Sequence, residues 1–123
     1  MSNAASSIRA LALSVTSKHG LNKCYDCAVE LRAVMMAAGK KGCILKLSTN
    51  GGRGFIVMKD VNFKVPFRMQ GEEAIASSGQ HFGVHVGGFV FDNVHREGIA
   101  RAAWQDTFDC DVHAFTLTEQ DHF

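Results

Sequence analysis

Two cysteines, two histidines and one aspartate have the types and the spacing to form a nucleophilic site. Cys24 and Cys27 stand three residues apart in the segment NKCYDCAVELR, while His81 and His85 precede a Gly-Gly pair and Asp92 follows it. An imidazole that takes a proton from a thiol creates a nucleophile, and a carboxylate can orient that imidazole. These residues therefore predict a Cys-His-Asp site, provided that the fold brings them together.

The two cysteines lie at the start of a predicted helix over residues 25–38. Its N-cap is predicted at Asn22, its C′ residue is Gly39, and an apolar stripe runs along it: Cys27, Leu31, Val34, Met35, Ala38. Cys24 precedes that stripe and falls in the first turn, where free backbone N–H groups and the helix dipole favour a thiolate. Lys23 adds a nearby positive charge. The spacing thus favours Cys24 as the nucleophile and Cys27 as a packed neighbour.

The histidines and the aspartate lie on the two arms of a predicted hairpin. A two-residue turn at Gly87 and Gly88 places Asp92 opposite Gly83, with His81 and His85 at the diagonal positions. Diagonal side chains on one face are within reach of one another, so the Asp92 carboxylate can bind one of these imidazoles. Gly83 leaves room for that bond.

The remaining segments predict a mixture of helices and strands. Residues 8–15 and 96–108 have helical composition, and 42–47 and 55–60 are β-prone runs that are expected to pair across a Gly-rich turn. Residues 61–69 contain Pro66, which predicts an edge strand or an extended loop, and 111–117 form a last strand.

Composition limits the domain count and the partners. The chain has 123 residues, of which 46% are hydrophobic and 20% charged, with one Pro, which is typical of one compact ordered domain. Residues 1–7 are interpreted as a tag remnant and disordered lead, 8–118 as the domain and 119–123 as a tail. The formal net charge is +1, which gives no general attraction to nucleic acid or anionic lipid. No membrane insertion is expected from this domain.

Several motifs resemble one known family. The segments CYDCA, GQHFGVHVGG and FVFDNVHREGI, followed by a Trp, are similar to the papain-fold toxin domains at the C-termini of bacterial polymorphic toxins, over about residues 20–108. A Cys with an acidic residue two positions on and an Ala four positions on also resembles the transglutaminase-like branch of this fold. Cys24, Asp26 and Ala28 match that pattern, His81 matches the family histidine and Asp92 the family acid.

The resemblance implies both a fold and an activity. The fold is α+β and papain-like, with N-terminal helices packed on a small antiparallel sheet. The activity is that of a cysteine-dependent peptidase, deamidase or transglutaminase with Cys24, His81 and Asp92 as catalytic residues and no cofactor. The family also implies an antibacterial toxin of the contact-dependent growth inhibition type, secreted within a larger effector. It would act on a protein in the cytoplasm of a target bacterium and be neutralised by a cognate immunity protein.

Alternatives remain for the site. A papain-like cysteine pair would make Cys27 the nucleophile, and His85 could replace His81 as the base. Cys24 and Cys27 with Cys110 and His113 also form a Cys3His set, which predicts a non-catalytic binding module stabilised by zinc. We expect no metal, because the first pair lies on a helix stripe rather than on a tight knuckle. Residues outside these sets are interpreted as core (Cys43), packing (Trp104) or solvated (His19, His95, His122).

Overall fold

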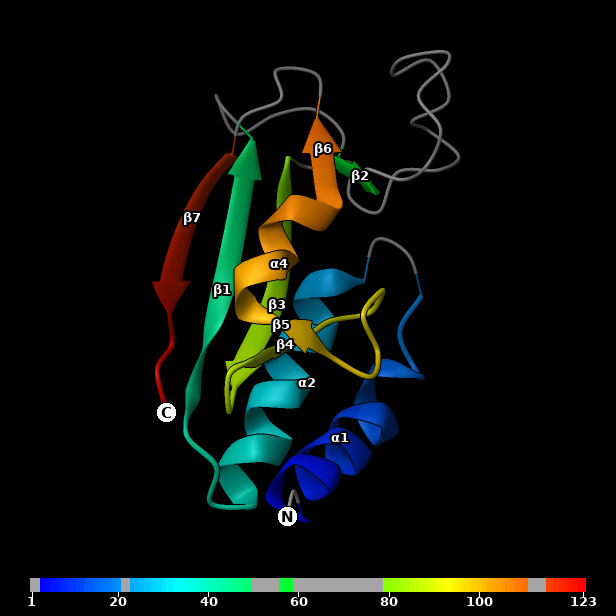
Figure 1. Cartoon of the computed structure of the whole chain (residues 1–123), viewed down its shortest axis with the longest axis vertical. Coiled ribbons are helices and arrows are strands. Elements are labelled where there is room, and N and C mark those ends of the chain that lie inside the picture. The colour runs from blue at the N-terminus through cyan, green and yellow to red at the C-terminus, as the bar shows by residue number, and fades with distance from the viewer. Residues whose placement is uncertain (1–2, 21–22, 50–55, 59–78, 111–114) are drawn as a thin grey trace.

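The computed structural model describes residues 3–20, 23–49, 56–58, 79–110 and 115–123 (Figure 1). The helices are α1 (Asn3–Thr16), α2 (Cys24–Ala37) and α4 (Arg101–Trp104), followed by a 3-10 turn, η1 (Gln105–Thr107). The strands are β1 (Gly42–Thr49), β2 (Ile56–Met58), β3 (Gln80–Val86), β4 (Phe89–Phe91), β5 (Ile99–Ala100), β6 (Phe108–Cys110) and β7 (Phe115–Gln120). The predicted α+β class is confirmed. Within the described ranges, no helix has the length and apolar character to cross a membrane.

The main sheet has five strands in the order β5-β4-β3-β1-β7, and every neighbouring pair in it is antiparallel. The predicted pairing of the runs at 42–47 and 55–60 is wrong. Strand β1 pairs with β3 and β7, whereas β2 joins β6 in a separate two-stranded sheet. Both partners of β1 come from much later in the chain, so a local turn signal could not identify them. The predicted edge strand or loop over 61–69 lies outside the described residues.

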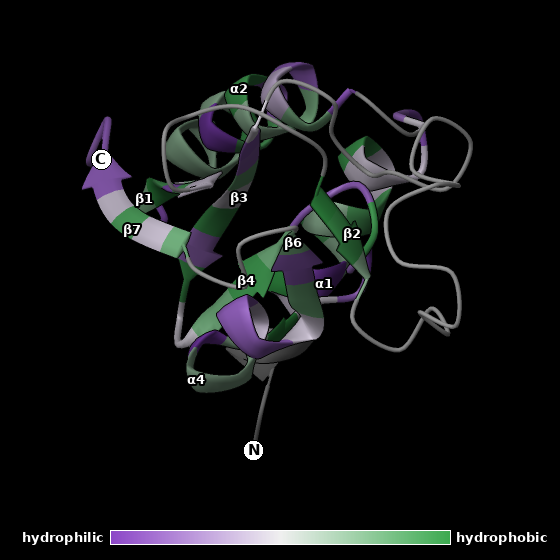
Figure 2. Ribbon diagram, turned by 90° about the horizontal axis from the view of Figure 1, so that it is seen from above, coloured by the Kyte–Doolittle hydropathy of each residue, from purple (hydrophilic) through white to green (hydrophobic). Residues whose placement is uncertain are grey.

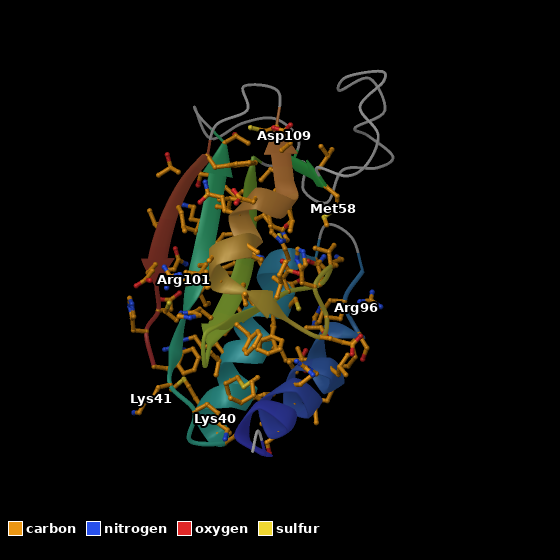
Figure 3. The ribbon with its side chains drawn as sticks, viewed as in Figure 1. Lys40, Lys41, Met58, Arg96, Arg101 and Asp109 are labelled. Atoms are coloured by element: carbon orange, nitrogen blue, oxygen red, sulfur yellow. The ribbon has the colours of Figure 1, made fainter. Side chains whose placement is uncertain are left out.

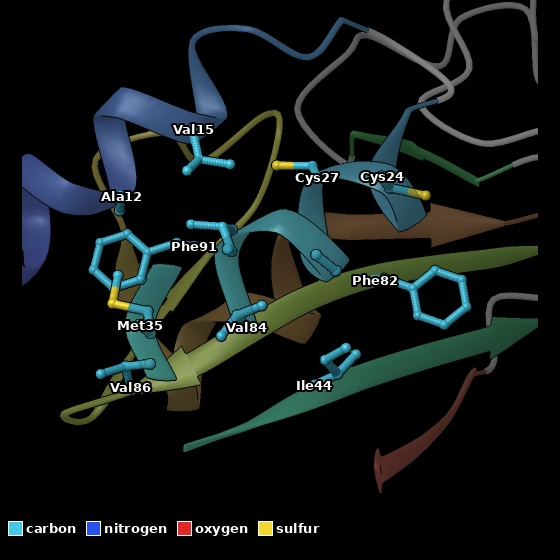
Figure 4. Packing of buried hydrophobic residues seen from close by; sticks show 12 residues of the cluster. Ala12, Val15, Cys24, Cys27, Met35, Ile44, Phe82, Val84, Val86 and Phe91 are labelled. Carbon is cyan, nitrogen blue, oxygen red and sulfur yellow. The ribbon is translucent and has the colours of Figure 1, made fainter. Parts of the chain in front are cut away.

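The five-stranded sheet separates two hydrophobic clusters. One lies under α1 and α2 and includes Leu31, Met35 and Val84, whose packing Figure 4 shows from close by. The other lies on the opposite face, around Trp104 and Phe108. Figure 2 accordingly shows α2 and α4 on opposite sides of β3. Burial of apolar side chains on both faces is the main stabilising contribution to this arrangement.

Helix α2 has the predicted position. It starts one residue earlier than predicted, with Lys23 at the cap position and no capping side chain, while Asn22 lies outside the described residues. At the other end Gly39 has φ +76°, and the N–H groups of Lys40 and Gly39 donate to Met35 and Met36. This is a Schellman motif, which uses the left-handed glycine predicted there. Of the predicted stripe, Ala38 is exposed.

Helix α1 is longer than predicted. It begins at Asn3, inside the segment 1–7 that the sequence assigns to a disordered lead. Ala4 and Ala5 have high helix propensity and continue the helical composition of residues 8–15 backward.

The predicted hairpin is present. Val84 pairs with Phe91 and Val86 with Phe89, and both turn glycines have positive φ, as a two-residue hairpin turn of the primed type requires. The helix predicted over 96–108 is mostly absent, because β5 pairs with β4 and α4 covers only four residues before η1 and β6.

The C-terminal residues pair with β1. Strand β7 runs to Gln120, and Phe123 exchanges two backbone hydrogen bonds with Gly42, of 2.9 and 3.1 Å. Residues 119–123, which the sequence assigns to a polar tail, are thus part of the sheet edge.

Candidate active site

The hairpin brings His81 and Asp92 into direct contact in the interior. His81 comes from β3 and Asp92 directly follows β4, and both side chains are fully buried. The Nε2–H of His81 donates to Oδ2 of Asp92 over 2.8 Å. The predicted contact between Asp92 and one imidazole of β3 is therefore confirmed, and that imidazole belongs to His81.

The Asp92 carboxylate receives hydrogen bonds from five donors. The indole Nε1–H of Trp104 donates to Oδ2 over 2.8 Å, beside His81. The backbone N–H groups of Val94 and His95 donate to Oδ1, and Nδ1 of His95 lies 3.2 Å from both oxygens. Burial by itself raises the pKa of Asp92, but hydrogen bonds and charges from His81 and His95 hold it far below its ordinary value. The carboxylate is therefore a fixed negative charge in the interior.

The interpretation of His95 as a solvated side chain is wrong. Its backbone and its ring both contact Asp92, and the ring packs edge-on against Phe108 with centroids 5.4 Å apart. An aspartate that accepts from the N–H groups two and three residues on forms an Asx-type turn. The Asp-x-x-His spacing of residues 92–95 was the available signal.

Trp104 also does more than pack. It donates to Asp92, and its ring stacks near the His81 imidazole with centroids 5.8 Å apart. The absence of a side chain at Gly83 leaves room for the indole, because a Cβ there would lie 2.7 Å from Cγ1 of Val90 and 3.0 Å from Cζ2 of Trp104. The space that the sequence predicts at Gly83 is thus occupied by the indole.

Gly83→Ala should therefore disturb Trp104 and destabilise the domain by about 1 to 3 kcal/mol, the usual cost of overpacking. Trp104 is the single tryptophan of the chain, so its intrinsic fluorescence reports the change directly. The matched control is Gly20→Ala, because among the residues that the structure describes no heavy atom lies within 4 Å of a Cβ at Gly20. An unchanged unfolding midpoint and emission spectrum for Gly83→Ala would contradict this account.

Cys24 lies beside the part of β3 that does not pair with β4. The β3–β4 pairing ends at Val84 and Phe91, and beyond it the Cys24 sulfur lies 3.9 Å from the carbonyl oxygen of Gln80. The backbone N–H group of Phe82 also contacts this sulfur, as does that of Tyr25 in the first turn of α2. Cys24 can therefore approach His81 past the edge of β3, although the His81 ring lies on the opposite face of the sheet from α2.

The electrostatics of Cys24 and His81 are coupled. Burial raises the pKa of Cys24, but interaction with His81 and the N–H groups of Phe82 and Tyr25 outweighs it and lowers the pKa overall. Burial lowers the pKa of His81, but the bond to Asp92 and the interaction with Cys24 raise it to about 9. Nδ1 of His81 completes no hydrogen bond of regular geometry within the described chain. The arrangement favours a thiolate beside an imidazolium whose Nδ1–H is not otherwise engaged.

Cys27 has the opposite environment. It is fully buried under α1, and Figure 4 shows its sulfur pointing toward Val15, away from the sulfur of Cys24. Burial, with the charge of Asp92 as a further cause, raises the pKa of Cys27 to about 12. Cys27 is therefore a neutral thiol across the physiological range.

The alternative residues from the sequence are not assembled into this site. His85 faces Arg101, with its Nδ1 3.1 Å from Nη1, and burial followed by the Arg101 charge lowers its pKa. Among the described residues, the one group of three potential metal ligands within 4.8 Å of one another is Cys43, Glu119 and His122. The structure therefore does not gather Cys24, Cys27 and Cys110 around one point, and His113 lies outside the described ranges.

An α+β domain with a cysteine at a helix N-terminus, facing a His-Asp pair on an antiparallel sheet, has a papain-like architecture. The family described as papain fold toxin 2 matches residues 7–109, and the chain belongs to this family. Neither a curated protein nor a solved structure gives a match. The domain is thus a papain-fold toxin domain, a class compatible with cysteine hydrolase activity.

Proposed function

We propose that this domain is a cysteine-dependent amide hydrolase or acyl transferase with Cys24 as nucleophile, His81 as acid and base, and Asp92 as the orienting carboxylate. The observation that carries the proposal is the contact between His81 and Asp92 in the interior, with the thiol of Cys24 on the other side of the ring. Nε2 of His81 is bound by Asp92, so Nδ1 is the nitrogen that serves Cys24.

The acylation step follows from this assignment. The Cys24 thiolate attacks the carbonyl carbon of an amide and forms a C–S bond, while the carbonyl π electrons move to oxygen. Backbone N–H groups in the first turn of α2, including that of Cys24, hold the oxyanion. When the tetrahedral intermediate collapses, the C–N bond breaks and the Nδ1 proton of His81 moves to the leaving nitrogen, which gives a thioester and a neutral imidazole.

Deacylation reverses the proton transfer. The neutral His81 takes a proton from the incoming nucleophile, which attacks the thioester and releases the Cys24 thiolate. Water completes a peptidase or deamidase reaction, and an amine completes transglutamination. Asp92 stays ionised throughout and keeps the ring in the tautomer that presents Nδ1 to Cys24.

The family supports a biological setting for this chemistry. We infer that the domain reaches the cytoplasm of a competing bacterium as the toxic part of a larger secreted effector, and that it modifies a protein there. A cognate immunity protein would protect the producer by covering the mouth of the site around Cys24. The balanced net charge gives no support for nucleic acid as the target.

Selective alkylation tests the nucleophile assignment without knowledge of the substrate. Limiting iodoacetamide near pH 6 should label Cys24 first, because its pKa is lowered, whereas Cys27, with a pKa of about 12, should stay unlabelled in the folded protein. Peptide mass spectrometry locates the label. His81→Ala should slow the labelling of Cys24, since the imidazolium no longer stabilises the thiolate. Preferential labelling of Cys27 would overturn the assignment. It would support the alternative in which Cys27 is the nucleophile of a papain-like cysteine pair.

A further inference from the structure

A second group of chemically capable side chains lies at the edge of the sheet formed by β1 and β7. Cys43 is a buried thiol on β1, Glu119 lies on β7 and His122 follows this strand. Their ligand atoms all lie within 4.8 Å of one another. The sequence gives no local sign of this group, since Cys43 is more than 70 residues from the other two.

The backbone around His122 is fixed on both sides. The following residue, Phe123, forms two backbone hydrogen bonds with Gly42, next to Cys43. The preceding residue, Asp121, accepts a bond of 2.8 Å from Nε of Arg32 at its carbonyl oxygen. His122 is therefore held near Cys43 by the main chain, and its exposed ring needs only small rotations to reach a shared ligand.

The two oxygens of the Glu119 carboxylate have different partners: one faces His122 within this group, and the other binds Arg101. Oε1 lies 3.1 Å from Nε2 of His122, and Oε2 lies 2.5 Å from Nη2 of Arg101. Arg101, which Figure 3 labels beside this part of the sheet, also contacts His85. A carboxylate that binds a metal is commonly oriented by such an outer hydrogen bond.

We propose that Cys43, Glu119 and His122 bind one Zn²⁺ through Sγ, Oε1 and Nε2, with a fourth position open to water. A thiolate with an imidazole suits zinc, whereas Ca²⁺ and Mg²⁺ prefer oxygen ligands alone. Zinc bonds of about 2.0 to 2.3 Å would close the present separations by small movements of the exposed Glu119 and His122. The ion takes the place of the proton between Oε1 and Nε2.

Binding must also release the thiol proton of Cys43. Burial and the Glu119 charge raise the pKa of Cys43, while the Arg101 charge opposes this change. Zinc affinity should therefore increase with pH. The site joins the end of the chain to β1 and is independent of the function proposed for Cys24, so either proposal can fail without the other.

Metal titration of the full chain tests this site. Cys24→Ala serves as the background, because Cys24 and His81 could themselves hold an ion. In contrast to the expectation of no metal from the sequence, this proposal predicts one Zn²⁺ per chain by calorimetry, and a thiolate-to-metal charge-transfer band in the near ultraviolet with Co²⁺. In this background Cys43→Ser should remove the band and weaken binding by more than about 100-fold, since even the loss of an outer partner costs about 10- to 100-fold.

His122→Ala provides a second test that leaves the core intact, and it should weaken binding by a similar factor. The matched control is His19→Ala. His19 Nε2 lies 3.0 Å from Oε1 of Glu30, and within the described part of the chain no group of three potential ligands includes this His-Glu pair. That control should keep wild-type affinity. Absence of binding, binding that survives both Cys43→Ser and His122→Ala, or binding that Cys110→Ser abolishes instead would overturn the proposal.

Discussion

Cys24→Ser should abolish the toxicity of the domain when it is expressed in the bacterial cytosol without a protecting partner. A serine hydroxyl is far less acidic than a thiol, so the His81 imidazolium cannot hold it ionised, and no comparable nucleophile forms. Loss of the nucleophile from a comparable triad reduces turnover by roughly 10⁶-fold. Growth curves after induction, together with the amount of soluble folded protein, measure the effect.

Cys27→Ser is the matched control, because it makes the same atomic change three residues further along α2. Cys27 is fully buried, and its sulfur points away from that of Cys24 (Figure 4), so a hydroxyl there should cost about 1 to 3 kcal/mol of stability. Toxicity should persist wherever the protein remains folded. Toxicity that survives Cys24→Ser, or that disappears with a stably folded Cys27→Ser, would show that the nucleophile is misassigned.

Asp92→Asn should have the second largest effect, on both the ion pair and the fold. Five donors converge on the two carboxylate oxygens. Asparagine replaces one of these oxygens by an NH₂ group, which is itself a donor and cannot accept their hydrogen bonds. The His81 imidazolium also loses its buried counter-charge. Removal of one partner from a buried ion pair costs about 3 to 5 kcal/mol. Chemical denaturation measures this loss, and Asp106→Asn, at an exposed carboxylate in η1, should change stability little.

The stability lost in Asp92→Asn should depend on pH in a defined window. The pKa of His81 is raised from 6.5 to about 9 in the folded protein, so its contribution is complete below pH 6.5 and disappears as pH rises through 9. The pKa of Asp92 is lowered from 3.8, so its contribution is complete above that value and disappears as pH falls. The difference between the wild type and Asp92→Asn should therefore be largest from about pH 4 to 6.5. A difference that grows above pH 9 would contradict this account.

The same substitution should move the labelling profile of Cys24. Without the Asp92 charge, burial lowers the pKa of His81, and the thiolate loses its cationic neighbour at neutral pH. Alkylation of Cys24 should then require a higher pH than in the wild type. An unshifted profile in a folded Asp92→Asn protein would exclude Asp92 from the control of this pair.

Local patterns predicted the parts of the fold that local physics determines. The apolar spacing and Gly39 defined α2, and the Gly-Gly pair fixed the register that brings Asp92 toward His81. Pairing of β1 with β3 and β7 was not predictable in this way, because it depends on packing between segments far apart in the chain. The helix expected over residues 96–108 is mostly absent because of tertiary pairing as well: Ile99 and Ala100 form strand β5, which pairs with β4.

The residue types of the site were predictable, but their supporting contacts were not. Cys24, His81 and Asp92 followed from helix position, hairpin register and family resemblance. The contacts of His95 and Trp104 with Asp92 depend on a tight turn after Asp92 and on the space above Gly83. Both features are set by the three-dimensional course of the backbone, which residue types and spacing do not give. The grouping of Cys43 with Glu119 and His122 likewise requires the β1–β7 register.

The thiol and the imidazole belong to different hydrophobic clusters. Cys24 is part of the cluster under α1 and α2, whereas the His81 ring packs with Trp104 and Phe108 on the other face of the sheet. Neither cluster by itself contains both the Cys24 thiol and the His81 imidazole, and the two groups meet past the end of the β3–β4 pairing. Loss of either cluster therefore separates the Cys24 thiol from the His81 imidazole. If the proposed function holds, a chain that is unfolded, or folded on only one face, has no working site, so activity would begin only after both faces of the sheet have packed.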